Sequence, residues 1–277
     1  MKITYLGTAA AEGFPALFCN CSYCREARLL GGKNIRTRSQ SLINDDLLID
    51  FPPDAYAHFL SGGIEGHKIK HLLITHGHRD HFYQLDLFNR QYPYAHDMSV
   101  PMLEMICSAA TAQKFESSIE SFASKHENKI TVKVISPFET VKAGNYEITA
   151  LPARHMPGGE ALIYVIKGDK TLLYAHDTGY FFEEVFEYIK ENKIRFDMVS
   201  LDCTNVNIKI GDDGSHMGFE NISRVLSGLE EIGATDGKTL KYVNHFSHNG
   251  NPLQDYLEKE AGKYGCSVAY DGCSVEF

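Results

Sequence analysis

A short histidine-rich run offers the clearest chemistry in this sequence. His76, His78, Asp80 and His81 fall within six residues, in the order His-x-His-x-Asp-His. Neutral imidazole and carboxylate are ligands that suit zinc, manganese or iron. His76 and His78 lie two positions apart, so on extended chain their side chains point to one side. Asp80 and His81 follow where the chain turns, and adjacent residues there point in different directions. The run therefore predicts ligands for two neighbouring metal ions.

More ligand-type residues follow the ends of short apolar segments later in the chain. His155, Asp177 and His245 each stand at such a place, and Asp50 ends an earlier segment. A solvated loop with accidental histidines does not account for this recurrence. The order of Asp50, the run 76–81, His155, Asp177 and His245 resembles the signature of the metallo-β-lactamase superfamily. The resemblance covers nearly the whole chain.

That resemblance implies an α+β fold, a four-layer αββα sandwich with a dinuclear metal site along one edge of its two sheets. It also implies the ligand sets: His76, His78 and His155 for the first metal, Asp80, His81 and His245 for the second, and Asp177 as a bridge. The two divalent ions would be manganese or zinc, with iron as a further option, and would share an activated hydroxide. Asp50 is expected to orient a ligand histidine, although capping the helix after Pro53 is an alternative role.

Three cysteines form a second candidate metal site at C-x-C-x₂-C spacing: Cys19, Cys21 and Cys24. Three thiolates at this spacing can occupy three corners of a zinc tetrahedron. In one branch of the superfamily, the cyclic phosphodiesterases of the carbon–phosphorus lyase pathway, such a triplet and a late histidine hold a structural zinc. The resemblance to that branch assigns the fourth place to His248. Cys266 and Cys273 are the competing ligands.

His216 and Asp80 are the candidate catalytic residues. His216 precedes a predicted helix, in a place that resembles the catalytic histidine of the cyclic phosphodiesterases and of the tRNA 3′-end endonucleases. A histidine with a pKa near neutrality can protonate a leaving oxygen or bind a phosphate. The alternative for His216 is a helix-capping or core histidine. His176 matches no ligand position and is expected in the core or behind a ligand.

The amino-acid composition limits the kinds of partner that this protein can have. The 277 residues include 27 Lys and Arg against 36 Asp and Glu, a net charge of −9. An acidic chain disfavours nucleic acid as a partner, and no segment approaches the roughly 20 apolar residues of a membrane span. Seven cysteines, an odd number, and no recognisable export signal indicate the cytoplasm. We expect a single hydrolase domain over residues 1–277, with a small zinc-binding loop at 19–24.

The predicted function is a metal-dependent phosphodiesterase acting on a small cyclic or nucleotide-like phosphodiester. A tRNA 3′-processing endonuclease is one alternative, but no Gly/Pro-rich arm lies between His81 and His155. A thioester or lactone hydrolase on the same metal site is another. A zinc-stabilised interaction protein without catalysis is disfavoured because every ligand position is filled. The branch resemblance also implies a homodimer.

Apolar patterning predicts the elements that carry these residues. The expected strands are 2–6, 39–43, 47–50, 71–74, 100–106, 130–135, 139–143, 145–152, 161–167, 171–175, 198–203 and 241–244. The expected helices are 25–30, 109–125, 180–192, one that the chain enters over 216–220 and that runs to about 231, and 252–263. Residues 266–277 are expected to form a closing hairpin. The aromatic stretch 82–98 is expected to form the wall of the active-site mouth, through packing more than substrate contact.

Overall fold

The computed structural model describes residues 1–122, 129–156 and 160–277, and in this part of the chain two seven-stranded sheets face each other. The first sheet has the order β14-β1-β2-β3-β4-β5-β6, with bounds β14 Cys273–Glu276, β1 Lys2–Gly7, β2 Gln40–Ile43, β3 Leu47–Ile49, β4 His71–Leu73, β5 Leu103–Cys107 and β6 Ile130–Val134. The second has the order β13-β12-β11-β10-β9-β8-β7, with bounds β13 Ser267–Val268, β12 Leu240–Asn244, β11 Met198–Asp202, β10 Thr171–Ala175, β9 Leu162–Lys167, β8 Tyr146–Pro152 and β7 Thr140–Ala143.

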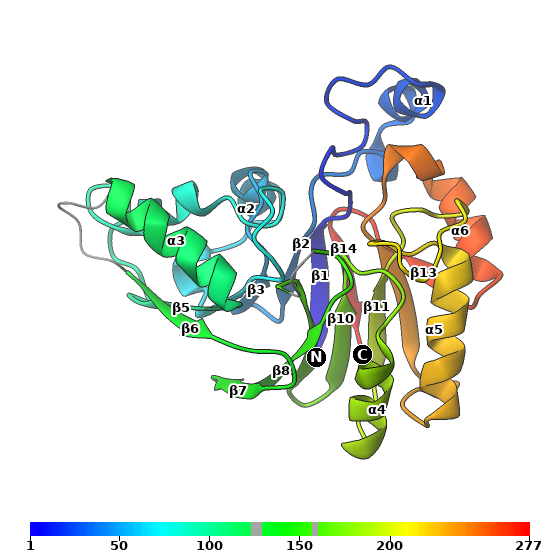
Figure 1. The fold of residues 1–277 in the computed structure, drawn as a ribbon. Helices are drawn as coiled ribbons and strands as arrows, with labels where there is room; N and C mark the ends of the chain where they lie inside the picture. Colours follow the sequence, from blue (N-terminus) through cyan, green and yellow to red (C-terminus); the bar gives the residue numbers. More distant parts are fainter. Residues whose placement is uncertain (123–128, 157–159) are drawn as a thin grey trace.

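Helices cover both outer faces, as Figure 1 shows. The bounds are α1 Ser22–Leu30, α2 Ala55–Ser61, α3 Ala109–Phe122, α4 Glu183–Glu191, α5 Phe219–Glu231 and α6 Gln254–Gly262. Helices α2 and α3 lie on the side of the first sheet, and α4, α5 and α6 on the side of the second. Short 3₁₀ helices add η1 Gly32–Asn34, η2 Gly66–Lys68, η3 Gln84–Arg90 and η4 His248–Gly250. The predicted αββα sandwich is confirmed.

Strand periodicity explains why the chain forms four layers. In β3, Leu47 and Ile49 pack between the sheets, while Leu48 packs on the outer face beneath the helices. In β4, Leu73 packs between the sheets and Leu72 packs on the outer face. Successive strand residues point to opposite faces, so a strand buried on both faces is apolar throughout. None of the described helices has the length and apolar character needed to cross a membrane.

Two expectations about the strands had opposite outcomes. The hairpin turning at Asn44 is confirmed, with Ser41 opposite Ile49. The closing hairpin is wrong: β13 pairs with β12 in the second sheet, and β14 pairs with β1 in the first. Between them, Asp271 accepts hydrogen bonds from the Thr8 hydroxyl at 2.6 Å and the Thr37 backbone at 2.6 Å. These contacts hold the chain where it passes from one sheet to the other.

The first aromatic residues after the histidine run pack into the outer core, which corrects their expected place at the active-site mouth. Phe82 is fully buried, and Phe88 stacks on Phe115 of α3 with ring centroids 6.0 Å apart. Tyr94 lines a separate cavity beside η3. The described part of the predicted helix 109–125 ends at Phe122, and residues 123–125 lie outside the described chain.

One edge of the sandwich collects the polar ends of several strands. Strands β3 and β4 are parallel, as are β10, β11 and β12, so their carboxyl ends lie together. Asp50, Asp177 and His245 follow β3, β10 and β12 at this edge, with φ of 63°, 52° and 66°. Left-handed backbone is uncommon for residues with a side chain and is found preferentially at functional sites.

Candidate metal centre

Three of the predicted ligands meet in one group at this edge: His76, His78 and His155. His155 Nε2 lies 3.1 Å from His78 Nδ1, and the rings of His76 and His78 are 4.5 Å apart. His155 Nδ1 lies 3.2 Å from the Ser215 carbonyl, which can only accept, so Nδ1 carries the proton and Nε2 keeps its lone pair. The His76 Nε2 atom is buried without a hydrogen-bond partner. These nitrogens are available to a shared cation.

A second group lies beside the first and contains Asp80, His81, Asp177 and His245. His81 Nε2 lies 3.3 Å from both His245 Nε2 and Asp80 Oδ2, and Asp177 Oδ2 is in close contact with it. Asp177 Oδ2 lies 3.1 Å from His245 Nε2 and 3.9 Å from His76 Nε2. The Asp177 carboxylate thus lies between the two groups, in the place predicted for the bridging ligand.

In the second group, the charges lie on a buried acid–base pair, the Asp177 carboxylate and the His81 imidazole. Burial opposes ionisation of Asp177, but His245 and His81 hold the pKa of its carboxyl well below the usual value. Burial also opposes a charge on His81, yet the carboxylates of Asp177 and Asp50 raise the pKa of its imidazole well above 6.5. His76 differs, because burial and the neighbouring His81 lower its pKa.

The residues present fit a pair of divalent ions. Within each group the ligand atoms lie within 4.8 Å of one another, and the nitrogen and oxygen donors are those that zinc, manganese and iron accept. His76 Nε2 and Asp177 Oδ2 are buried, and neither makes a hydrogen bond. A cation here would take the place of the His81 proton, since metal binding releases protons from its ligands.

Other buried residues orient the ligand imidazoles. Asp50 Oδ2 accepts a hydrogen bond from His81 Nδ1 at 2.7 Å, and the Thr75 backbone and hydroxyl donate to the same carboxylate. The expected orienting contact of Asp50 with a ligand histidine is present. On the opposite side, Thr204 Oγ1 lies 2.8 Å from His245 Nδ1. Partners of this kind fix the tautomer of a metal-binding histidine.

His216 lies next to the second group, beside a carboxylate that the sequence analysis did not select. Its Nδ1 atom is 3.0 Å from Asp202 Oδ2 and 3.3 Å from Asp177 Oδ1. Burial lowers the pKa of His216, but the charge and hydrogen bond of Asp202 outweigh it and raise the pKa to about 9. Asp202 is fully buried at the end of β11. Its position at the end of an apolar strand, as with Asp50, was the signal that could have found it.

Asp202 and His216 also belong to a third cluster with Asp177 and His245. The Asp202 carboxylate, however, already accepts from the backbone N–H groups of Asp177, Thr204 and Met217 at 3.0 to 3.1 Å. An oxygen pair committed to these donors positions its neighbours rather than coordinating an ion. His176 is a core residue: it is buried, and its Nε2 lies 2.7 Å from the Ser200 hydroxyl.

The cysteine triplet meets His248 in a separate cluster. The Sγ atoms of Cys21 and Cys24 lie 3.7 and 3.8 Å from His248 Nδ1. The hydrogen bond with His248 lowers the pKa of Cys21 to about 6, whereas burial raises that of Cys24 to about 11. The competing ligands do not join it: Cys266 and Cys273 are buried in the two main cores. Four soft donors in one cluster suit zinc.

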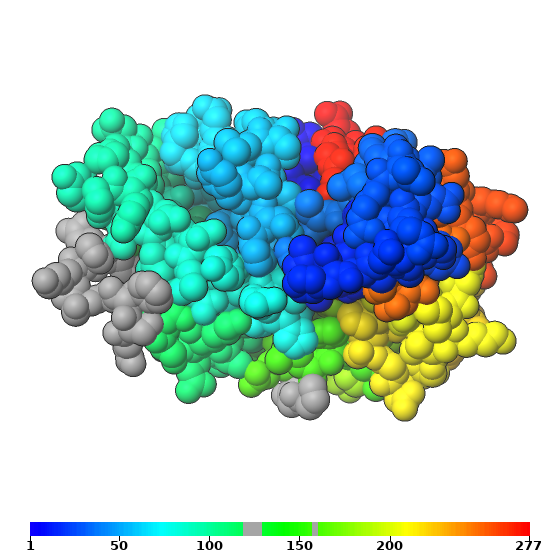
Figure 2. Space-filling view, turned by 90° about the horizontal axis from the view of Figure 1, so that it is seen from above, coloured from blue at the N-terminus to red at the C-terminus, as the bar shows by residue number. Residues whose placement is uncertain are grey.

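A carboxylate that the sequence analysis missed stands behind this cluster. Glu12 Oε1 accepts from the Ser247 hydroxyl at 2.6 Å and lies 3.9 Å from His248 Nε2. Ser247 and His248 belong to the same loop as His245, and the neighbouring Phe246 forms a bridge with Ala9. Figure 2 shows this packing from above, with the blue N-terminal segment against the orange segment before α6. The two candidate metal sites therefore share one loop.

Comparison with known proteins places this geometry in a family. The sequence model of the beta-lactamase superfamily domain matches residues 47–245. A coenzyme PQQ synthesis protein B from Acinetobacter baumannii (strain ACICU) is 24% identical, and the alignment covers 100% of both chains. A diphosphatase of the PhnP family has the same fold, with a TM-score of 0.73, 21% identity and coverage of 100% of this chain and 97% of the other.

Zinc-bound PqqB from Methylobacterium extorquens is also similar, with a TM-score of 0.76, 19% identity and full coverage of both chains. At these identities the solved structures establish the fold and not the reaction. The matched domain includes β3 through β12 and all seven candidate ligands of the two histidine–aspartate groups. The chain belongs to the metallo-β-lactamase superfamily of metal-dependent hydrolases.

Proposed function

We propose that this protein is a dinuclear-metal phosphodiesterase that hydrolyses a small cyclic or nucleotide-like phosphodiester. The observation that carries the proposal is the position of His216, whose Nδ1 lies 3.0 Å from Asp202 Oδ2 at the edge of the ligand cluster. Superfamily sites serve several hydrolytic reactions, and a protonated imidazole beside the metal ligands favours those that expel a poor leaving group. An alkoxide released from a phosphodiester is such a group.

In this proposal the residues have distinct roles. His76, His78 and His155 would hold one ion, Asp80, His81 and His245 would hold the other, and Asp177, which lies between the two groups, would be available to both. When bound, the two ions supply an activated water nucleophile and polarise the phosphoryl oxygen. Burial opposes the charge on Asp80, but the hydrogen bond from His81 keeps the pKa of its carboxyl low, so Asp80 remains an anionic ligand near neutral pH.

His216 acts as the general acid in the proposed reaction. Asp202 accepts only at its oxygens, so His216 Nδ1 carries a proton and the imidazolium can release its second proton from Nε2. That proton passes to the leaving oxygen as the bond to phosphorus breaks. Because Asp202 raises the pKa of His216 to about 9, the acid form is populated at neutral pH.

The cysteine cluster has a structural role in the proposal. Cys19, Cys21, Cys24 and His248 would hold one zinc ion in a closed site with no position left for substrate. The fold shared with a PhnP-family diphosphatase supports hydrolysis at phosphorus, and the fold shared with zinc-bound PqqB supports zinc as a metal of this protein. We further propose a homodimer in the cytoplasm, with a small-molecule phosphodiester as substrate.

The test is a substrate panel with purified, metal-analysed protein. The panel contains bis(p-nitrophenyl) phosphate, a ribosyl 1,2-cyclic phosphate, a nucleoside 2′,3′-cyclic phosphate, a pre-tRNA, an acyl thioester and a lactone. We expect turnover of the phosphodiesters with zinc or manganese. His78→Ala should abolish that turnover, and His67→Ala, a half-buried histidine outside the ligand groups, should not. Hydrolysis of the thioester or lactone without any phosphodiester turnover would overturn the proposal, as would a preference for pre-tRNA.

A further inference from the structure

A cavity of about 450 Å³ lies beside η3, on the outer side of the first sheet. Its floor consists of core residues of β3, β4 and β5, namely Leu48, Leu72 and Leu103. Phe51 and Phe59 form one wall and meet edge to face at 6.4 Å. A volume in the range of about 300–1,000 Å³ with apolar and aromatic walls is typical of sites for small organic ligands. None of the metal-ligand candidates lines this cavity.

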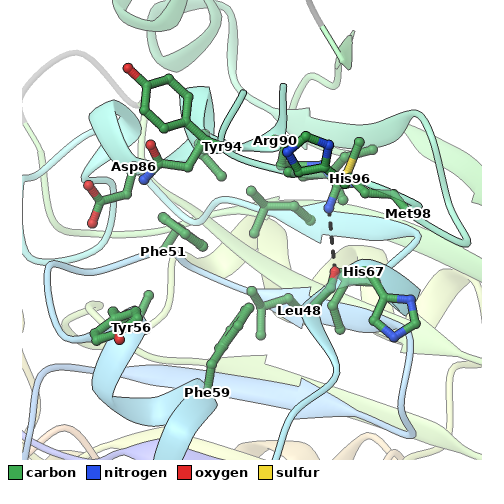
Figure 3. A pocket seen from close by; sticks show the side chains of 18 residues that line it. Leu48, Phe51, Tyr56, Phe59, His67, Asp86, Arg90, Tyr94, His96 and Met98 are labelled. Carbon is green, nitrogen blue, oxygen red and sulfur yellow. Dashed lines mark hydrogen bonds between the residues drawn. The ribbon is translucent and has the colours of Figure 1, made fainter. Parts of the chain in front are cut away.

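Arg90 brings an uncompensated positive charge to this apolar cavity. Its Nη2 donates to the Val100 carbonyl at 2.8 Å and its Nη1 to the Gly66 carbonyl at 3.4 Å, the contact drawn as a dashed line in Figure 3. The buried Nε atom has no partner. The guanidinium has five N–H donors, and these contacts use two. Among the described residues, no carboxylate forms an ion pair with it.

The other polar side chains at the cavity do not compensate this charge. Asp86 also lines the cavity, but Figure 3 shows it well apart from Arg90. Burial alone lowers the pKa of Arg90, with no contribution from a neighbouring carboxylate. His96 Nε2 donates to the Pro93 carbonyl of its own loop at 3.0 Å. A partly buried cation is stabilised when it pairs with an anion.

Aromatic side chains stand at the rim. Tyr56 of α2 and Tyr94 of the loop after η3 are 72% and 67% exposed, although both line the cavity. Their rings offer a flat apolar surface at the entrance, and large exposed aromatics at a concave site are typical of recognition surfaces. The cavity therefore combines an apolar floor, an aromatic rim and one cation without an anionic partner.

We propose that this cavity binds a small apolar acid, with its carboxylate on the Arg90 guanidinium and its aromatic or branched aliphatic body against Phe51 and Leu72. The carboxylate accepts from Nη1, whose protein contact is the longer of the two. The site is separate from the metal centre, and it does not depend on the proposed phosphodiesterase reaction. The cavity is nevertheless close in sequence to the histidine run 76–81, because η3 begins three residues after His81.

Three naphthalene probes of matched shape test the proposal: 1-naphthoate, 1-naphthalenemethanol and 1-naphthylmethylammonium. The chain contains no Trp, so the fluorescence of the probes can be followed directly. The titrations use metal-loaded protein without added phosphate, because phosphate is an anion that would compete with naphthoate for Arg90. We expect naphthoate to bind roughly 10- to 100-fold more tightly than the alcohol, and the ammonium to bind most weakly. Equal affinity for acid and alcohol in the unaltered protein would overturn the proposal.

Amino-acid substitutions show whether the naphthalene probes bind in this cavity. Arg90→Met should remove the preference for the acid while leaving the affinity for the alcohol unchanged. Ala95→Phe, which adds bulk to a lining residue without introducing a Trp, should weaken both probes and keep Arg90. Arg195→Met is the matched control, since Arg195 is exposed and pairs with Asp236 away from the cavity. Naphthoate binding that survives both Arg90→Met and Ala95→Phe would assign the probe to another site. The comparison of probes in the unaltered protein decides the proposal even if Arg90→Met does not fold.

Discussion

The Nδ1 atom of His216 lies 3.0 Å from Oδ2 of Asp202, and the carboxylate of Asp202 is itself held by three backbone N–H groups. This arrangement keeps an anion in a fixed position behind the imidazole. Burial works against protonation of His216, and Asp202 more than offsets it, which raises the pKa to about 9. The protonation state of His216 therefore depends on a residue that touches no substrate.

Asp202→Asn should move the alkaline limb of the pH–rate profile to lower pH. A general acid must be protonated, so activity is present below its pKa and is lost as the pH rises through it. With the charge of Asp202 removed, burial would lower the pKa of His216 from about 9. The measurement is kcat/KM against pH for an alkyl phosphodiester. Asp213→Asn, an exposed carboxylate in the same loop, is the control, and an unchanged limb in Asp202→Asn would remove Asp202 from this role.

His216→Ala should show a marked dependence on the leaving group. A general acid contributes about 10²- to 10⁴-fold to rate, and an alkoxide needs the proton far more than a nitrophenolate. Turnover of an alkyl or ribosyl phosphodiester should therefore fall by about that factor, with a much smaller loss for bis(p-nitrophenyl) phosphate and no change in metal content. Equal losses on both substrates, together with a lower melting temperature, would indicate a structural histidine. A raised KM on both would indicate phosphate binding.

Asp177→Asn should remove both activity and metal. Asn tolerates left-handed backbone, so the substitution keeps the φ of 52° at this position while removing the charge. Because partners behind a metal ligand already cost about 10- to 100-fold when removed, loss of the shared ligand should cost at least about 100-fold. Native mass spectrometry should show fewer bound ions. Turnover equal to that of the unaltered protein would contradict the dinuclear assignment.

Cys21→Ser should lower stability and leave the chemistry intact. A closed zinc site contributes to folding rather than to catalysis, so the variant should lose one equivalent of zinc. The melting temperature should fall by about 10 °C or more, while phosphodiester turnover persists at low temperature. Cys266→Ser, a buried cysteine outside the cluster, is the control for loss of zinc. A variant with an unchanged melting temperature and no turnover would move the cysteines into the active site.

The candidate ligand positions could be predicted from the sequence because they stand where an apolar strand ends or in the loop that follows one, and strand ends at one edge converge. Asp202 follows the same rule but was not selected, since nothing in its own neighbours shows that it would lie beside His216. The sheet assignment of residues 266–277 could not be predicted either. It depends on contacts of Asp271 with Thr8 and Thr37, more than 230 positions away in the chain.

The aromatic stretch illustrates a different limit. Phe82, Phe88 and Tyr94 have similar side chains, but the first two are packed against α3 and the third lines a solvent-open cavity. Periodicity does not distinguish these environments in a short irregular segment, because no regular helix or strand fixes the direction of each side chain. The charge of Arg90 without a partner likewise emerges only from the packed structure.

The cysteine cluster has a consequence for the lifetime of the folded state. Its candidate ligands Cys21 and His248 are 227 positions apart in the chain, so we expect them to meet late in folding. Closing so long a loop early in folding would be entropically unfavourable. An ion bound there would stabilise the native state without stabilising the folding transition state, and interactions of that kind slow unfolding while leaving the folding rate nearly unchanged. The protein with zinc at this cluster would unfold more slowly, while its folding rate would stay the same.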